Sequence, residues 1–393
     1  MKTIINSKGI ETRIFAETFE FEAYNQIKKL VNFEPYLNSK VRIMPDAHAG
    51  KGCTVGTTMT ITNHVTPNLV GVDINCGMLT VKLKNKEINF EKLDSVIRKY
   101  IPHGFDIHTK SQKKFDFSKL KCLKKVDVLR ATYSIGTLGG GNHFIEVATS
   151  SDDDLYLIIH TGSRKLGTDV CKFHQDKAFQ NVNEMSAVVE NTIAKLKKEG
   201  KQNQIQNTIK TLKKPSADKD LATLTGTDFD DYINDMKIVS DYAKLNRETI
   251  AEIILKEANL QKESSFETVH NYIDFKRMIL RKGAISAEKD EIVLIPMNMR
   301  DGSLLCKGKG NSEWNYSAPH GAGRLMSRSK AKENIDFVDF KNSMLNVFTT
   351  SVTQSTLDEA PQAYKPMQEI INLISETVEI IDILKPLYNF KSN

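Results

Sequence analysis

The sequence predicts an α+β protein: a single large mixed α/β domain over residues 1–393 that carries a helical insertion at about 170–260. Two patterns support this prediction. Residues 40–170 alternate short apolar runs with glycine-rich turns, which is typical of strands. Residues 170–260 favour helices with lysine- and glutamine-rich outer faces and a break near Pro215. No repeat or low-complexity block divides the chain.

The expected strands of the first half are the runs TVGTTMTITNHV, LVGVDI, MLTVKL, FIEVA and LYLIIH. Residues 265–310 are mixed and include the buried-type run EIVLIP. Apolar residues from Met367 to Leu384 keep a three-four spacing, which predicts an amphipathic helix. Pro366 suits its first turn and Pro386 its end, and a short strand-like LYNFK follows.

The composition is that of a soluble globular protein, with 40% hydrophobic and 26% charged residues. No apolar run approaches the ~20 residues that span a bilayer. The N-terminal MKTIINSKGIETRIF lacks the apolar segment of a secretory signal. Five scattered cysteines favour free thiols in a reducing compartment. We therefore expect a cytoplasmic protein without a membrane partner.

The net charge of +6 is concentrated in two lysine-rich segments. Residues 110–125 hold seven lysines against Asp116, and residues 195–214 hold seven against Glu199. Phe115 and Phe117 interleave the first segment, as on a surface that binds single-stranded nucleic acid. Taken alone, each segment is more simply explained as a solvated lysine-rich loop or helix face. The charge permits a polyanionic partner without establishing one.

Several segments supply side chains that commonly bind metal ions. GVDINCGM places Asp73 and Cys76 three apart in a turn, His143 and His160 lie at the ends of predicted strands, and ETVHNYIDF (267–275) offers His270. Thiolate, carboxylate and imidazole together suit a borderline-soft divalent ion, and a thiolate can bridge two ions. Taken singly, each residue is also explained as a buried thiol, a hydrogen-bonded core histidine or an Asx cap. Ligand type favours zinc, followed by manganese and iron.

The segment PHGAGRLMSR at 319–328 holds a histidine inside a glycine-rich turn. The run after Gly323 favours a helix, on which Arg324 and Arg328 would share a face. A helix N-terminus preceded by glycines is an anion site, so a phosphate would dock at His320. The positive surroundings would keep the imidazole neutral, as a nucleophile requires. The alternative is a loop histidine beside a solvated basic helix.

A second glycine run, Gly139–Gly141, can approach a phosphate closely because no side chain intervenes. In the strand that follows, Asn142, Phe144 and Glu146 alternate onto one face. Asn142 could bond a phosphate oxygen, and Glu146 could accept from the edge of a base. These residues make the turn a candidate nucleotide contact.

Six separate motifs resemble the RtcB RNA ligases and occur in that family's order from about residue 40 to the C-terminus. They are MPDAHAGKG (44–52), GVDINCGM (71–78), GGGNHFIEV (139–147), HTGSR (160–164), the His-Asn pair at 270–271 and HGAGRLMSR (320–328). The resemblance implies an enzyme that joins RNA 3′-phosphate or 2′,3′-cyclic phosphate ends to 5′-hydroxyl ends. It also implies GTP and manganese as cofactors, one or two Mn²⁺ ions in preference to Zn²⁺ or Fe²⁺, and a role in tRNA splicing or RNA repair.

The resemblance also assigns roles to individual residues. Cys76 would bridge the metal ions, and His320 would become guanylylated before GMP passes to the RNA 3′-phosphate. The other implied roles are metal ligation by Asp73, His143, His160 and His270; GTP or GMP contacts by Asn142, Phe144, Glu146, Tyr364 and Lys391; and RNA phosphate contacts by Arg164, Lys282, Arg324 and Arg328. The implied partners are RNA ends, tRNA among them, and an archease-type activator. We expect a monomer.

The chain departs from the family pattern at three places. Residues 297–302 read MNMRDG where the family has a glycine-serine-methionine-glycine loop, Lys391 is followed by Ser392 and Asn393, and HTGSR has threonine where serine is common. Two other functions remain open at this stage. One is a metal-dependent phosphoesterase that opens cyclic phosphates without joining ends, and the other is a non-catalytic RNA-binding protein with a structural metal.

Overall fold

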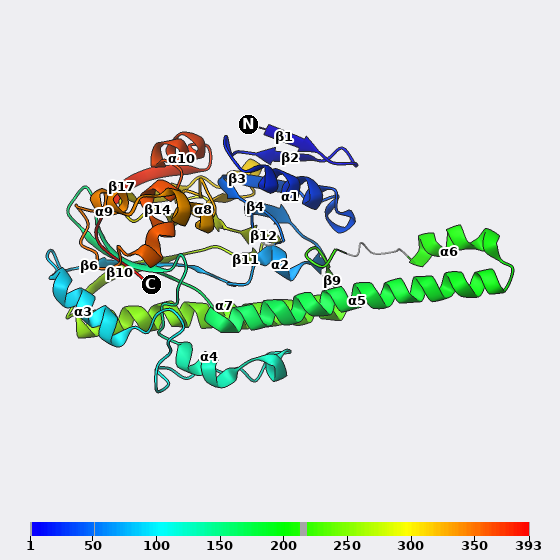
Figure 1. Cartoon of the computed structure of the whole chain (residues 1–393), viewed down its shortest axis with the longest axis horizontal. Helices are drawn as coiled ribbons and strands as arrows, with labels where there is room; N and C mark the ends of the chain where they lie inside the picture. The colour runs from blue at the N-terminus through cyan, green and yellow to red at the C-terminus, as the bar shows by residue number, and fades with distance from the viewer. Residues whose placement is uncertain (1, 51, 213–217, 393) are drawn as a thin grey trace.

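The computed structural model describes residues 2–50, 52–212 and 218–392 and confirms an α+β fold built on two large sheets (Figure 1). The first sheet has the order β1-β2-β3-β4-β12-β11. Its strands are β1 (Lys2–Ile5), β2 (Glu11–Ile14), β3 (Val41–His48), β4 (Val55–Thr60), β12 (Ile279–Lys282) and β11 (Tyr272–Asp274). All neighbours are antiparallel except β2 and β3, which are parallel.

The second sheet has the order β10-β6-β8-β7-β17-β15-β14 and is antiparallel throughout. Its strands are β10 (Lys262–Val269), β6 (Gly77–Leu83), β8 (Leu155–Thr161), β7 (Phe144–Thr149), β17 (Val378–Lys391), β15 (Gly302–Gly308) and β14 (Ile292–Asn298). Two short pairs complete the strands: β13 (Ala284–Ser286) with β16 (Ser317–Pro319), and β5 (His64–Val65) with β9 (Leu224–Thr225).

Two long helices form an arm along one side of the molecule (Figure 1). Helix α5 (Arg164–Lys198) packs against α7 (Gly226–Glu257), and α6 (Ile205–Leu212) lies beside the far end of α5. At 1.5 Å per residue α5 is about 50 Å long, so its distal half projects beyond the sheets. The helices expected between 170 and 260 are confirmed, while the break expected near Pro215 lies outside the described residues.

The remaining helices are short. They are α1 (Phe21–Val31), α2 (Pro67–Val70), α3 (Phe90–Tyr100), α4 (Val128–Ser134), α8 (Arg328–Asn334), α9 (Phe337–Ser343) and α10 (Met367–Ile374). Single 3₁₀ turns are η1 (Glu34–Tyr36), η2 (Leu123–Lys125), η3 (Gln202–Gln204), η4 (Ser312–Trp314), η5 (Gln354–Glu359) and η6 (Pro361–Ala363). Among the described residues, no helix combines the length and the apolar character needed to cross a membrane.

The core consists of separate apolar clusters on either side of the sheets. The largest joins the first sheet to α1, α2, α5 and α7 through residues such as Ile43, Met59 and Val239. A second packs the second sheet against α3 and α7, with Ile159 and Ile250 among its members. The parts of α5 and α7 that lie against the sheets are therefore part of the hydrophobic core.

Two sequence predictions of secondary structure are wrong. LVGVDI forms α2 and a turn instead of a strand, because Pro67 begins a helix that ends at Gly71, whose φ is +106°. The helix expected from Met367 to Leu384 stops at Ile374, and Val378–Lys391 is a strand. A bulge in the pairing with β15 skips Ile381, so the apolar alternation there loses its period of two and imitates a helical spacing.

The helix expected directly after Gly323 is also wrong, since α8 begins only at Arg328. Gly323 has φ +76°, and a Cβ at this position would lie 2.4 Å from the Asp46 carbonyl oxygen. The backbone here therefore presses against β3 in a conformation that no helix contains. Arg324 instead pairs with Tyr364 in an isolated bridge, so it does not share a helical face with Arg328.

Candidate functional site

The five predicted metal ligands converge where β6, β8 and β7 lie side by side. Cys76 precedes β6, and His160 lies on β8, opposite Met78 of β6 and Phe144 of β7. His270 follows β10, and its backbone N–H donates to the Cys76 carbonyl oxygen at 2.8 Å. The antiparallel register of adjacent strands thus gathers side chains from distant parts of the sequence.

The ligand atoms form two groups that share one thiol. In the first group the ligand atoms of Asp73, Cys76 and His143 lie within 4.8 Å of one another, and in the second those of Cys76, His160 and His270 do so. The Cys76 Sγ is 3.5 Å from His143 Nε2 and 3.4 Å from His160 Nε2. A shared thiolate between two ligand groups is the arrangement that a bridging cysteine would have.

Backbone carbonyls orient the histidines toward this thiol. His143 Nδ1 lies 2.9 Å from the Leu138 oxygen, and His160 Nδ1 lies 3.2 Å from the Asn142 oxygen. If each Nδ1 donates, the Nε2 lone pair faces Cys76, which is how outer hydrogen bonds fix a metal-binding tautomer. His270 keeps a buried Nδ1 with no partner among the described residues. The donor set therefore fits a divalent ion.

The protonation of these groups also suits metal binding. Burial holds the pKa values of His160 and His270 well below 6.5, so both imidazoles are neutral near pH 7. Burial and then the Asp73 charge raise the pKa of the Cys76 thiol. Burial also opposes ionisation of Asp73, but the His143 contact outweighs it and lowers the pKa of that carboxyl. An ion bound here would displace the thiol proton.

His320 lies at the end of β16, beside the second ligand group. Its ring is 4.7 Å from that of His270, centroid to centroid. The buried Asp46 carboxylate of β3 accepts the His320 backbone N–H at 3.1 Å and faces its Nδ1 at 2.6 Å through the same Oδ2 atom. This contact leaves Nε2 as the ring nitrogen available for attack. The surroundings of His320 thus include a carboxylate, which the expectation of a purely positive environment missed.

His48, on the same strand as Asp46, is a second residue that received no role from the sequence. Its Nδ1 lies 3.0 Å from the Asp46 carbonyl oxygen, and burial lowers its pKa to about 4. Both residues belong to the motif MPDAHAGKG. Two polar side chains in the middle of a strand-like motif could have indicated that Asp46 and His48 belong to the site.

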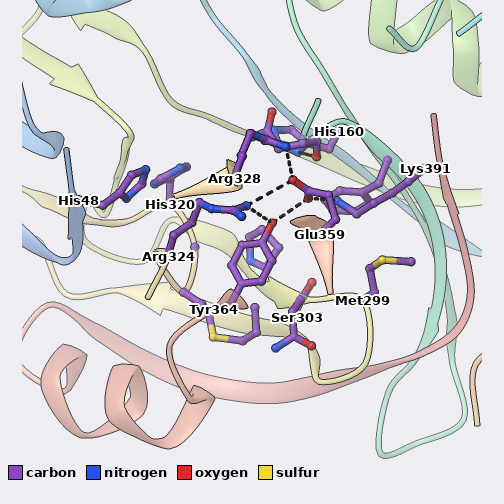
Figure 2. A pocket seen from close by; sticks show the side chains of 18 of the residues that line it. His48, His160, Met299, Ser303, His320, Arg324, Arg328, Glu359, Tyr364 and Lys391 are labelled. Atoms are coloured by element: carbon purple, nitrogen blue, oxygen red, sulfur yellow. Dashed lines mark hydrogen bonds and ion pairs between the residues drawn. The ribbon is translucent and has the colours of Figure 1, made fainter. Parts of the chain in front are cut away.

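Two cavities meet at His320. The larger, of about 410 Å³, is lined among others by Asn142, Phe144, Glu146, Tyr364 and Lys391, the residues expected to contact GTP (Figure 2). The smaller, of about 300 Å³, is lined by the metal-type residues Asp73, Cys76 and His270 and by Lys282. His48, Asn142, His320 and Arg328 line both cavities.

The larger cavity contains a buried acceptor and a divergent loop. Burial raises the pKa of Glu146 to about 8, its Oε2 accepts from Asn389 at 2.8 Å, and its Oε1 has no partner among the described residues. The end of β14, the turn after it and the start of β15 contribute Met297, Asn298, Met299 and Gly302 to the lining. The departure from the family pattern at 297–302 therefore lies in the cavity wall.

Glu359 connects most of the predicted cationic contacts (Figure 2). It accepts from Lys391 at 2.6 Å, Arg328 at 2.5 Å and the Tyr364 hydroxyl at 2.7 Å. Burial would raise the pKa of Glu359, but Lys391 and Arg328 lower it to about 2. Arg324 also reaches this carboxylate, at 3.4 Å. From the sequence, these cations were expected to contact GTP or RNA phosphates, and no carboxylate was expected between them.

The other two predicted RNA contacts occupy different positions. Lys282 lines the smaller cavity and donates to the Asn68 carbonyl oxygen at 3.0 Å. Arg164 begins α5, donating through Nη2 to the Gly104 carbonyl oxygen at 3.0 Å and through Nε to Thr137. Burial lowers the pKa of the Arg164 guanidinium. The charge of Asp73, a member of the first ligand group, opposes this shift.

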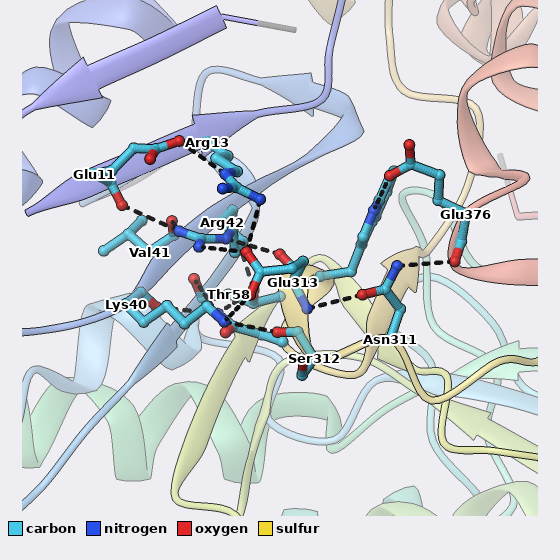
Figure 3. Close-up of polar contacts among 12 residues, drawn as sticks. Glu11, Arg13, Lys40, Val41, Arg42, Thr58, Asn311, Ser312, Glu313 and Glu376 are labelled. Carbon is cyan, nitrogen blue, oxygen red and sulfur yellow. Dashed lines mark hydrogen bonds and ion pairs between the residues drawn. The ribbon is translucent and has the colours of Figure 1, made fainter.

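A polar network links the turn η4, which precedes β16 and His320, to β2 and β3 (Figure 3). Glu313 of η4, four residues before β16, binds Arg13 of β2 at 2.7 Å and Lys40 at 3.1 Å. The Arg42 Nε of β3 donates to the Glu313 carbonyl oxygen at 2.8 Å. The same strand β3 carries Asp46, so this network fixes His320 and its carboxylate partner relative to each other.

The chain is thus an α+β protein in which a group of metal-type side chains lies beside a second, larger cavity. The family model described as tRNA-splicing ligase RtcB matches residues 26–129 and 108–392. The chain therefore belongs to the RtcB family.

Similar proteins cover almost the whole chain. The RNA-splicing ligase RtcB of Escherichia coli (strain K12) is 29% identical over 393 residues, which is 89% of this chain and 90% of the relative. The tRNA-splicing ligases RtcB of Aeropyrum pernix and Archaeoglobus fulgidus are each 24% identical, covering 91% and 96% of this chain and 89% and 92% of those proteins.

Proposed function

We propose that this protein is an RNA ligase that joins an RNA 3′-phosphate or 2′,3′-cyclic phosphate end to a 5′-hydroxyl end, using GTP and Mn²⁺, in tRNA splicing or RNA repair. Membership in the RtcB family and the names of the relatives support the class of reaction. The observation that carries the mechanism is the position of His320, which lines both the nucleotide-sized cavity and the cavity of metal-type ligands.

The reaction would begin with attack of His320 Nε2 on the α-phosphorus of GTP. The N–P bond forms, the bond from the α-phosphorus to the bridging oxygen breaks, and pyrophosphate leaves. Asp46 would hold the imidazole through Nδ1 and stabilise its positive charge as the N–P bond forms. A divalent ion held by Asp73, Cys76, His143, His160 and His270 would supply charge neutralisation for the phosphates.

The guanylyl group would then pass to RNA. An oxygen of the RNA 3′-phosphate attacks the phosphorus on His320, and the histidine leaves. The 5′-hydroxyl of the second RNA end next attacks the activated 3′-phosphate, loses its proton and expels GMP. Arg328, which lines both cavities, would neutralise phosphate charge during these transfers.

The nucleotide base would occupy the larger cavity. Phe144 and Tyr364 offer aromatic faces, and the unpartnered Glu146 Oε1 would accept from a donor on the base edge. Guanine presents such donors on its Watson–Crick edge. Release of Lys391 from Glu359 would let its ammonium reach an acceptor on the same base.

The experiment is label transfer from [α-³²P]GTP with Mn²⁺. The wild type should retain label in an acid-labile, alkali-stable bond, and His320→Ala should retain none. With RNA ends added, the wild type should yield joined product. Absence of label on the wild type, equal label on His320→Ala, or cyclic-phosphate opening without joined product would overturn the proposal. The last outcome would indicate a phosphoesterase.

A further inference from the structure

The segment of residues 103–130 lies against the arm and has no part in the proposed reaction. It connects Pro102 to α4 and is clamped onto α7, where Asp235 accepts the Lys121 and Cys122 backbone N–H groups at 2.7 and 3.1 Å. The same carboxylate faces His174 Nε2 of α5 at 2.9 Å. Residues 103–130 therefore form a fixed surface anchored to both helices of the arm.

The lysines of this segment divide into two kinds. Lys113 pairs with Glu252 of α7 at 2.6 Å, and Lys121 lies 3.9 Å from Asp231. The other five are exposed and form no ion pair within the described part of the chain; they are Lys110, Lys114, Lys119, Lys124 and Lys125. The local acid Asp116 accepts from the Ser118 backbone N–H at 2.9 Å. The acids of α7 thus neutralise the inner lysines and leave an outer cationic surface.

This surface begins near the site. Lys125 and the exposed Lys172 of α5 line one surface cavity of about 530 Å³. The two carboxylates in its lining, Asp169 and Asp176, pair with Lys165 and Lys219. Lys172 is eight residues after Arg164, about 12 Å along the helix. Arg164 in turn is held by the Gly104 carbonyl oxygen. Residues 103–130 therefore extend from Arg164, beside the metal-type residues, to the five lysines that form no ion pair.

The aromatic residues of the segment also divide into two kinds. Phe115 and Phe117 pack edge-on against each other, and Phe115 packs against Tyr242 of α7, so the expectation that they stack with bases is wrong. Phe105, next to Gly104, is 92% exposed, and Arg130 donates to its carbonyl oxygen at 2.8 Å. One ring is thus exposed at the end nearest Arg164, and beyond it the segment carries the five lysines without ion pairs and three exposed aspartates, Asp106, Asp116 and Asp127.

We propose that residues 103–130, with Lys172, form a docking surface for the RNA backbone beyond the reacting ends. Unpaired lysines without stacking partners fit phosphates and not bases, so the distal part would bind structured RNA irrespective of sequence. Phe105 would stack on a base close to the reacting end. The inference rests on the proposed RNA ligase function, because it names where that substrate extends.

The first test reverses the charge of three of the lysines that form no ion pair. Lys119→Glu/Lys124→Glu/Lys125→Glu is compared with Lys276→Glu/Lys289→Glu/Lys385→Glu, which changes equally exposed lysines without ion pairs among the described residues. Binding of a 5′-hydroxyl RNA hairpin should weaken about 10- to 100-fold in the first variant, and the dependence of log K on log salt should fall by roughly two to three. The control should bind like the wild type. Labelling by GTP alone should be unchanged in both.

These readouts separate the two proposals. Wild-type protein that neither takes label nor binds RNA would contradict the proposed function. Wild-type protein that ligates, together with equal RNA binding by both triple variants, would overturn the docking surface alone. Loss of binding to an acidic peptide without loss of RNA binding would assign the surface to a protein partner and would also overturn it.

A second test concerns the exposed ring. Phe105→Ala should raise the KM for the RNA end about 5- to 50-fold with little change in GTP labelling, which corresponds to one lost base stack. Phe105→Trp should restore a KM close to that of the wild type, because the aromatic face is kept. Equal KM values for Phe105→Ala and the wild type would remove Phe105 from the surface. A loss in Phe105→Ala that tryptophan does not rescue would contradict the stacking role.

Discussion

The effect of Asp46 on His320 can be tested by exchanging a single side-chain atom. Its Oδ2 faces both the backbone N–H and the Nδ1 of His320, and its side chain is fully buried. Asp46→Asn keeps the shape but removes the charge that stabilises an imidazolium. We expect single-turnover guanylylation to slow by at least about tenfold, within the range of up to ~10⁴ that such exchanges cost elsewhere. The KM for GTP and the bound Mn²⁺ should change little, and an unaltered rate would contradict the role.

Glu146, in the wall of the larger cavity, should make the stability of the protein depend on pH. Burial raises the pKa of its carboxyl from 4.5 to about 8, so between these values the folded chain holds a proton that the unfolded chain has lost. The resulting stabilisation is present below pH 4.5 and is lost as pH rises to about 8, at up to ~1.4 kcal/mol per pH unit.

Glu146→Gln should flatten this dependence. In urea unfolding without nucleotide, the drop in free energy of unfolding between pH 5 and pH 8 should be smaller in the variant by a few kcal/mol at most. Glutamine can still accept from Asn389, so the fold keeps that contact. The same drop in variant and wild type would show that Glu146 does not hold the proton.

Among the elements, we expect η4 to stabilise the fold mainly through the buried Trp314 and less through the ion pairs of Glu313. Trp314 is buried, stacks on Phe15 with 3.7 Å between ring centroids, and donates to Glu376 at 3.0 Å. Trp314→Ala should cost about 3–5 kcal/mol of unfolding free energy. Glu313→Gln should cost about 1 kcal/mol or less, since Glu313 is half exposed and its pairs are screened. Chemical denaturation of both variants measures the difference, and equal costs would contradict this ranking.

The accuracy of the sequence predictions depended on the element. The strands at Phe144–Thr149 and Leu155–Thr161 and the helices of the arm follow from local pattern, because each buries a regular face. In the strand Val378–Lys391 only the last segment, LYNFK, was predicted as a strand and is confirmed. The rest was not, because the strand bulges at Ile381 and again near Leu387 and pairs on both edges with distant strands. Local periodicity cannot show such pairing.

At the scale of the whole molecule, the candidate site residues within each motif could be predicted from the sequence. The contacts between residues of distant segments could not. Asp46 and His320 are 274 residues apart, and Glu359 meets Lys391 only because β17 returns beside β7. A buried carboxylate opposite a predicted cation leaves no local trace in the sequence. The motifs therefore indicated residues that line the two cavities, and the folding of distant segments determined which other residues contact them.

The shared thiol yields a final prediction about the assembled protein. Because Cys76 belongs to both ligand groups, Cys76→Ala should lower Mn²⁺ binding at both, whereas His270→Ala should lower it at one. Mn²⁺ at about 100 times its Kd should add roughly 2.7 kcal/mol per bound ion to the wild-type unfolding free energy and almost nothing to that of Cys76→Ala. Cys306→Ala is the matched control, since Cys306 is equally buried and lies outside these groups. Equilibrium dialysis and thermal unfolding with and without Mn²⁺ measure both effects. Unchanged Mn²⁺ binding by Cys76→Ala would show that the two groups do not depend on one bridging thiolate.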